Sequence, residues 1–169
     1  MELSRSSMLD LEASNFFSGC GFADVELQPA AMRAIFTSSV ESGRNETGGI
    51  LIGRYTDHGR TAVIVEATPR PRGSRFGWAW FQRSNAGLNK ILDQRWKDGL
   101  HYLGEWHFHP GGSPSPSGPD IVSMQSISSN RQYHCREPIL LIIGGRPPDE
   151  FDISVTVHPT GEDTIILRR

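Results

Sequence analysis

Two histidines one residue apart, His107 and His109, are the residues whose type and spacing most clearly suggest chemistry in this sequence. They lie in the stretch GEWHFHPGGSPSPSGPD, residues 104–120, which ends in Asp120. Alternate side chains of a β-strand share a face, so the two imidazoles would be neighbours at a strand end that Pro110 terminates. Zinc prefers imidazole nitrogen and carboxylate oxygen, and a catalytic zinc usually takes three protein ligands. The stretch therefore predicts a metal site formed by His107, His109 and Asp120.

Helix capping offers a simpler explanation for part of the same stretch. Ser117-Gly118-Pro119-Asp120 has the pattern of a helix start, in which Ser117 and Asp120 cap the first turn. Capping alone would explain both residues, and a His-x-His pair on a polar strand face is often ordinary. Their combination at this spacing favours the metal site, since the glycines and Ser-Pro repeats between them form a loop that can return Asp120 to the strand end.

The strands and helices that would position these residues alternate along the chain. This alternation predicts an α/β (α+β) fold around one mixed sheet. In the strand that carries the histidines, Tyr102, Trp106 and Phe108 are expected on the core face, with Leu103 and Glu105 on the face of the two histidines. β-branched runs predict strands over 48–55, 61–69, 76–84, 100–109, 138–145 and 150–158, and helical spacing with capping residues predicts helices over 28–46, 85–99 and 118–130.

Length and composition limit the class of protein. A chain of 169 residues is the size of one domain, here 1–169 with 1–25 as an N-terminal extension, and needs no metal or disulfide to fold. A net charge of -2 gives no general attraction to nucleic acid, and no apolar run suggests a membrane span or signal peptide. We therefore expect a cytoplasmic protein without nucleic-acid or membrane partners. The separated Cys20 and Cys135 are expected to be free thiols.

Two motifs give the chain a resemblance to a known family. HFHPGGSPSPSGPD resembles the H-x-H-P, six residues, S-x-x-D signature of the JAMM (JAB/MPN) zinc metalloproteases. Upstream, ETGGILIG is similar to the family's E-x-x-G-x-L-x-G pattern, with Glu46 in the acidic position. Motifs and element order together cover about residues 28–157. The resemblance implies a JAB/MPN (cytidine-deaminase-like) fold, a curved mixed sheet flanked by helices with a zinc site at the end of a central strand.

The resemblance also implies roles for individual residues. His107, His109 and Asp120 correspond to the ligands of one Zn²⁺ ion, Glu46 to the general acid/base, and Ser117 to the residue that stabilises the oxyanion. Rival residues are expected elsewhere: Glu105 in a solvated or supporting position, and Trp78, Trp80 and Trp96 in the core. Four further histidines, His58, His101, His134 and His158, have no partner at ligand spacing and are expected to be surface or hydrogen-bonded residues.

The substrate implied by the resemblance is a peptide or isopeptide bond after the C-terminus of ubiquitin, a ubiquitin-like modifier or a modifier-like protein. Within the family, the chain looks most like bacterial isopeptidases of anti-phage cyclic-oligonucleotide signalling systems (CBASS), which separate a nucleotidyltransferase from its conjugation partner. Ubiquitin-activating-like and conjugating-like enzymes would then act in the same pathway. Two alternatives stay open: processing of a sulfur-carrier protein, and a non-catalytic MPN scaffold module. No substrate-binding residue is predicted, although the basic segment 70–75 is either a solvated loop or a strap beside the site.

Overall fold

The computed structural model of this chain describes residues 13–19, 23–69 and 85–169, with the side chains of 85–88 excepted. Within these ranges strands and helices follow one another much as the sequence predicts. Their order is β1 (Ser14–Phe16), β2 (Asp24–Leu27), α1 (Pro29–Ser42), β3 (Thr47–Thr56), η1 (Asp57–Gly59), β4 (Thr61–Ala67), α3 (Asn85–Lys97), β5 (His101–Pro110), α4 (Gly118–Ser129), η2 (Arg131–Tyr133), β6 (Ile139–Arg146), β7 (Glu150–Val157) and β8 (Ile165–Ile166).

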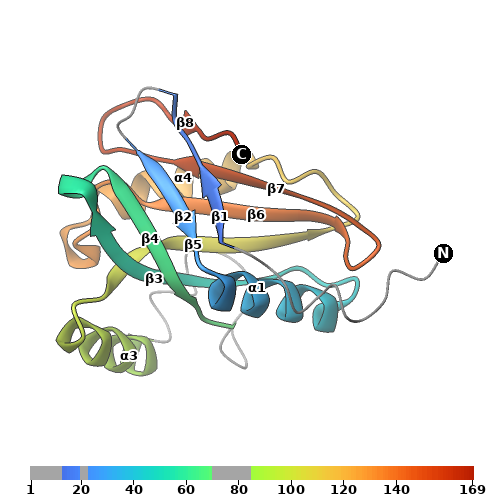
Figure 1. The fold of residues 1–169 in the computed structure, drawn as a ribbon, viewed down its shortest axis with the longest axis horizontal. Helices are drawn as coiled ribbons and strands as arrows, with labels where there is room; N and C mark the ends of the chain where they lie inside the picture. Colours follow the sequence, from blue (N-terminus) through green and yellow to red (C-terminus); the bar gives the residue numbers. More distant parts are fainter. Residues whose placement is uncertain (1–12, 20–22, 70–84) are drawn as a thin grey trace.

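The described strands form a single mixed sheet of eight strands in the order β1-β2-β4-β3-β5-β6-β7-β8 (Figure 1). The pairs β2·β4 and β5·β6 are parallel, and the other neighbours are antiparallel. Phe17 and Arg168 exchange backbone hydrogen bonds, so the chain beside β1 meets the chain beyond β8 and the sheet curls on itself. The mixed α/β sheet predicted from the sequence is confirmed, with β5 near its centre.

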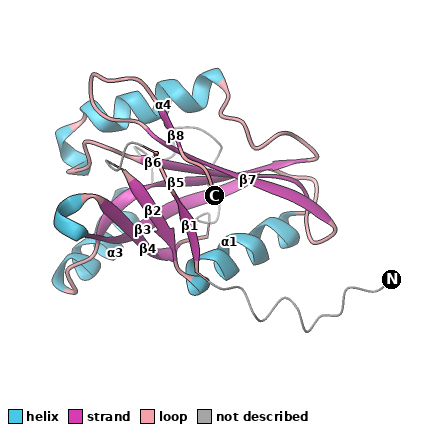
Figure 2. Cartoon of the chain, turned by 45° about the horizontal axis from the view of Figure 1, so that its top comes forward, coloured by secondary structure: helices cyan, strands magenta, loops and turns pink. Residues whose placement is uncertain are grey.

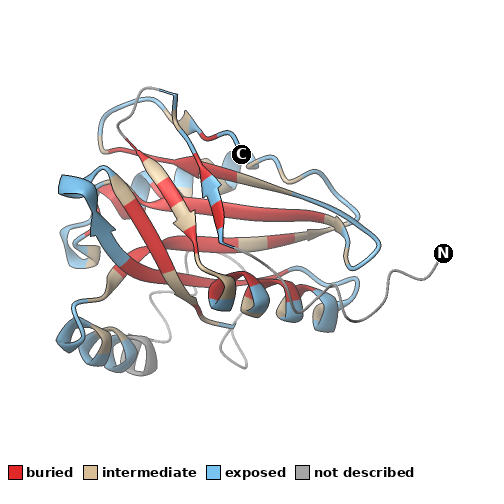
Figure 3. Cartoon of the chain, viewed as in Figure 1, coloured by how far each residue is buried: buried red, intermediate tan, exposed pale blue. Residues whose placement is uncertain are grey.

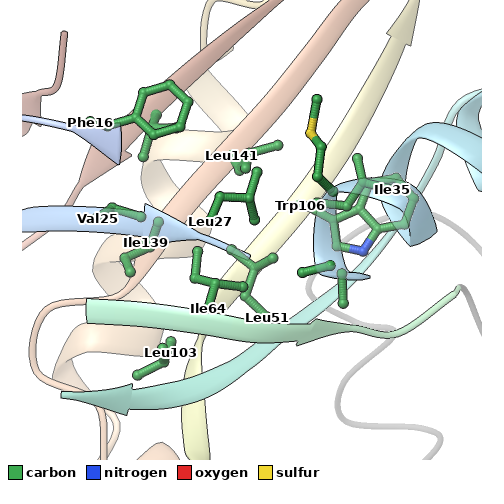
Figure 4. Close-up of a cluster of buried hydrophobic side chains, with 14 of the residues drawn as sticks. Phe16, Val25, Leu27, Ile35, Leu51, Ile64, Leu103, Trp106, Ile139 and Leu141 are labelled. Carbon is green, nitrogen blue, oxygen red and sulfur yellow. The ribbon is translucent and has the colours of Figure 1, made fainter. Parts of the chain in front are cut away.

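Helices α1 and α4 cover opposite faces of this sheet (Figure 2). Pro29 begins α1 at a position where its missing N–H costs nothing, and Gly43 ends it with a positive φ of 62°. One apolar cluster contains Ile35 of α1 and Trp106 of β5, which lie against each other in Figure 4. The second cluster joins Met124 of α4 to Tyr102 and neighbouring apolar residues of β3 and β6. The strand residues of both clusters lie in the part of the sheet that is buried (Figure 3).

A β-bulge in β5 changes the predicted alternation of its side chains. Leu51 of β3 pairs with Gly104, whereas Ile52 pairs with Tyr102, so Leu103 is an extra residue. The bulge places Leu103 in the cluster of Trp106 and Tyr102 in the cluster that α4 covers. The prediction for Tyr102 and Leu103 was therefore wrong. The residues after the bulge alternate as predicted, with Trp106 and Phe108 in the core beneath α1.

Several other predictions differ from the structure. Three short strands, β1, β2 and β8, were not predicted, and Trp96 is 62% exposed, where it packs edge-on to His101. Its assignment to the core was wrong. Cys135 is confirmed as a buried free thiol. Cys20, the basic segment 70–75 and the predicted strand over 76–84, which includes Trp78 and Trp80, lie outside the described residues. Among the described helices, none is long and apolar enough to cross a membrane.

Candidate metal centre

The histidine pair lies where β5 ends. His107 and His109 face the same side of the sheet, and in the parallel neighbour β6 they lie opposite Ile142 and Gly144. Both side chains are partly buried, with 17% of His107 and 20% of His109 exposed. Each imidazole is therefore anchored by a strand with neighbours on both sides and still reaches the surface.

Asp120 returns to the histidines from the first turn of α4. Ser117 and Asp120 form a capping box: the Ser117 Oγ accepts from the Asp120 N–H, and Asp120 accepts from the Ser117 N–H at 2.8 Å. The Ser117 hydroxyl also donates to Asp120 Oδ2 at 2.6 Å. The other oxygen, Oδ1, lies 3.0 Å from His107 Nδ1. Capping and the approach to His107 are thus simultaneous, because Oδ2 accepts the bonds of the cap and Oδ1 faces His107.

The loop between the strand and the helix is packed down by two residues of the sheet. A Cβ on Gly144 would lie 2.6 Å from both the Gly112 carbonyl oxygen and the Pro114 nitrogen, so only glycine allows this close approach. Ser154 of β7 donates a hydrogen bond to the Pro114 carbonyl. These contacts fix the path that carries the chain from His109 to Asp120.

The three side chains fit the requirements of a metal centre. One ligand atom of each of His107, His109 and Asp120 lies within 4.8 Å of the others. Two ligands of a tetrahedral zinc, each about 2.0–2.1 Å from the metal, are roughly 3.3 Å apart. The distances from Asp120 to His107 Nδ1, 3.0 Å, and to His109 Nε2, 3.8 Å, lie on either side of that value. The sequence prediction brought these residues together correctly, and their role as zinc ligands remains a proposal.

The electrostatics of the group follow from its carboxylates. Burial alone would lower the pKa of His107, but the hydrogen bonds that its ring donates to the carboxylates of Asp120 and Glu105 outweigh it and raise the pKa to about 9. Burial acts to raise the pKa of Asp120, but the bonds from His107 and Ser117 dominate and hold it well below its usual value. In the metal-free protein at neutral pH, His107 is thus protonated and Asp120 ionised, and a cation at this site would displace the proton of His107.

Glu105 differs most from expectation among the residues near the site. Its side chain is only 11% exposed, and its Oε2 lies 3.3 Å from His107 Nε2. The solvated position allowed from the sequence is wrong, because Glu105 is buried against His107. His107 therefore has a carboxylate on each side of its ring.

The backbone places Glu46 beside the histidine pair. Glu46 is exposed and immediately precedes Thr47, the first residue of β3, which pairs with Phe108 between the two histidines. It does not belong to the close group of His107, His109 and Asp120. Its predicted role as acid/base depends on this position at the start of β3 and stays a proposal.

The remaining histidines behave as the sequence predicts. His58 and His134 are exposed, and His101 packs against Trp96. His158 is 2% exposed and hydrogen-bonded through both nitrogens, to Thr156 at 2.9 Å and Thr164 at 3.2 Å. Burial lowers its pKa to about 4, although the negative charge of Asp120 acts in the opposite direction. His158 is thus a neutral structural residue.

Comparison with known proteins identifies the class that this fold and site define. Residues 28–157 match the family described as prokaryotic homologs of the JAB domain. The chain belongs to this family, as its resemblance to JAMM proteins implied.

Two relatives of this chain are both named CD-NTase/cGAS isopeptidase. A protein from Enterobacter hormaechei is 45% identical over 168 residues, which is 99% of this chain and 93% of that one. A protein from Pseudomonas aeruginosa is 36% identical over 105 residues, 60% of this chain and 63% of that one.

A solved structure from Desulfitobacterium hafniense shares the fold. It aligns with a TM-score of 0.56 at 20% identity, over 83% of this chain and 87% of that one. This similarity supports the architecture of the sheet and helices, and the sequence relatives support the family.

Proposed function

We propose that this chain is a zinc-dependent isopeptidase that cleaves the bond between the C-terminus of a CD-NTase, a nucleotidyltransferase, and the protein to which it is conjugated. The observation that carries the proposal is the convergence of His107, His109 and Asp120 at the end of β5. Membership of the JAB family and 45% identity to a protein named CD-NTase/cGAS isopeptidase support the reaction and the substrate.

The residues around this group supply the parts of an amide hydrolysis. Zn²⁺ held by the three side chains would polarise the scissile carbonyl and lower the pKa of water toward about 7. Glu46, next to the histidine pair at the start of β3, would take the proton of the attacking water and return one to the leaving amine. Its exposed position leaves room for both transfers.

Ser117 would stabilise the negative oxygen that develops on the carbonyl carbon. In the structure its hydroxyl donates to Asp120 Oδ2, while its backbone N–H donates to the same oxygen. The hydroxyl can turn to substrate without breaking the cap, because the backbone bond persists. Capping and oxyanion stabilisation are thus compatible roles for one residue.

The proposed setting extends the resemblance to bacterial CBASS isopeptidases, and the name of the two relatives supports a CD-NTase as the substrate. Enzymes resembling ubiquitin-activating and conjugating proteins would form the bond in the cytoplasm, and this chain would reverse it during anti-phage signalling. We also propose that residues 1–169 form one catalytic domain. The modifier-like partner is the CD-NTase itself, whose C-terminus enters the new bond.

A defined conjugate tests the proposal. A CD-NTase joined through its C-terminal carboxyl to a lysine of its partner is incubated with zinc-loaded enzyme and with Glu46→Gln. The wild type should release a CD-NTase of intact mass, and the variant should release none. If the zinc-loaded enzyme leaves this conjugate intact but trims a C-terminal extension from a sulfur-carrier protein, the alternative processing reaction is supported instead.

A further inference from the structure

We propose that Glu105 is a positioning residue that holds the imidazole of His107 from the side opposite Asp120. The inference rests on the proposed function, because it concerns the same metal centre. Neither the family signature nor the predicted acid/base and oxyanion residues include this glutamate.

The contact geometry comes first. Glu105 and His107 are alternate residues of β5 after the bulge, so their side chains share a face. Glu105 Oε2 lies 3.3 Å from His107 Nε2, and Asp120 Oδ1 lies 3.0 Å from His107 Nδ1. The ring is therefore held between two carboxylates that come from different elements.

The surroundings of Glu105 make its presence costly without a partner. In the sheet it lies opposite Ile50 of β3 and Leu140 of β6, both completely buried. A carboxylate buried among apolar side chains destabilises a fold unless a hydrogen bond or opposite charge compensates. The compensating group is the imidazole of His107, so the glutamate and the histidine are coupled.

The coupling selects one form of the ring. A neutral imidazole has one nitrogen that donates and one that accepts. If a cation displaces the Nδ1 proton of His107, Glu105 still accepts the N–H of Nε2, and the Nδ1 lone pair then faces the cation beside Asp120. Histidines that bind metals usually donate their other N–H in this way, and loss of the acceptor typically weakens metal affinity 10- to 100-fold.

His109 shows the complementary arrangement. Its Nδ1 lies 3.1 Å from the Ser113 carbonyl oxygen, so Nδ1 donates and Nε2 faces Asp120 Oδ2 at 3.8 Å. The two histidines are thus fixed through opposite nitrogens, one by a carboxylate and one by a backbone carbonyl. We infer that the nitrogens directed at a cation are Nδ1 of His107 and Nε2 of His109.

The test compares three variants with the wild-type protein. Glu105→Leu removes the acceptor and suits the apolar surroundings, whereas Glu105→Gln removes the charge but keeps an oxygen. The matched control is Glu66→Gln, because Glu66 is a partly buried carboxylate of β4 whose partner is Arg95 at 2.6 Å. Zinc dissociation constants are measured by chelator competition, and the imidazole nitrogens are assigned by nitrogen-15 NMR of the zinc-loaded protein.

Glu105→Leu should bind zinc 10- to 100-fold more weakly than the wild type. The zinc affinity of Glu105→Gln should be intermediate between those of Glu105→Leu and the wild type, and the affinity of Glu66→Gln should equal that of the wild type. The wild-type spectrum should show a protonated Nε2 on His107, and this signal should shift in Glu105→Leu. A folded Glu105→Leu with wild-type affinity and an unchanged His107 signal would overturn the inference. If the wild type itself binds no zinc, the proposed function fails instead, so the two failures are distinguishable.

Discussion

Asp120 Oδ1 lies 3.0 Å from His107 Nδ1, although Asp120 is in the first turn of a helix and His107 is near the end of a strand 13 residues earlier. The same aspartate accepts two hydrogen bonds from Ser117 through its other oxygen. One carboxylate therefore ends the loop, caps α4 and faces the histidine pair. The metal centre and the helix start are a single structural unit.

The first prediction concerns the Ser117 hydroxyl. Ser117→Ala should lower the turnover of the folded enzyme by roughly 10²-fold or more if this hydroxyl stabilises the oxyanion. Loss of the cap alone would cost only about 1 kcal/mol of stability. Turnover and the unfolding free energy are measured on the same preparation. Unchanged turnover would show that Ser117 caps the helix but does not stabilise the oxyanion.

Zinc affinity should depend on pH through His107. Because the pKa of His107 is raised to about 9 in the metal-free protein, zinc must displace its proton at neutral pH. The apparent affinity should therefore rise about tenfold per pH unit between pH 7 and 8 and level off near pH 9. Calorimetry in buffers of different ionisation enthalpy should detect the released proton. An affinity that is constant from pH 7 to 8 would contradict the raised pKa.

The close packing at Gly144 predicts a sensitive position. Gly144→Ala would force the backbone of Gly112 and Pro114 away from the sheet, and overpacking of this kind typically costs about 1–3 kcal/mol. Because this loop leads to Asp120, zinc affinity should fall as well. Gly118→Ala is the control, since a Cβ there meets no atom within 4 Å. Equal zinc affinity and melting temperature in the two variants would show that the loop does not position Asp120.

The sequence predicted the group of His107, His109 and Asp120, but it did not predict the bulge in β5 or the burial of Glu105. H-x-H on a strand and S-x-x-D at a helix start are local patterns, so His107, His109 and Asp120 could be found from spacing alone. The bulge at Leu103 lies beside a non-local contact that local spacing does not reveal: a Cβ on Gly104 would lie 1.9 Å from the Ile139 carbonyl oxygen. The burial of Glu105 likewise depends on strands from distant parts of the chain.

The short strands were missed for a related reason. β1 and β8 contain three and two residues, too few for a period to emerge. They form by pairing with β2 and β7, and a bridge between Phe17 and Arg168 joins the chain beside them. Exposure of Trp96 was also not predictable from helical spacing, because spacing identifies a face but not what covers it.

His158 predicts how the fold responds to acid. Its pKa is about 4 in the fold against 6.5 for an ordinary histidine, so between these values the unfolded chain binds a proton that the fold does not. This contribution to stability is complete above pH 6.5 and is lost as the pH falls toward 4. His158→Gln should therefore lose less unfolding free energy than the wild type between pH 7 and 5. In denaturant titrations the exposed control His58→Asn should behave as the wild type, and identical pH dependence in all three would exclude this role.

The central claim is that His107, His109 and Asp120 hold a zinc ion, and that Glu46 acts as the acid/base beside it without being a ligand. Its most direct test is zinc content by elemental analysis of the wild type, Glu46→Gln and His109→Ala, each purified without a metal-binding tag. About one zinc per chain is predicted for the first two proteins and little for the third, as expected for three protein ligands. A wild type that contains no zinc after reconstitution, or a His109→Ala variant that retains it fully, would contradict the account.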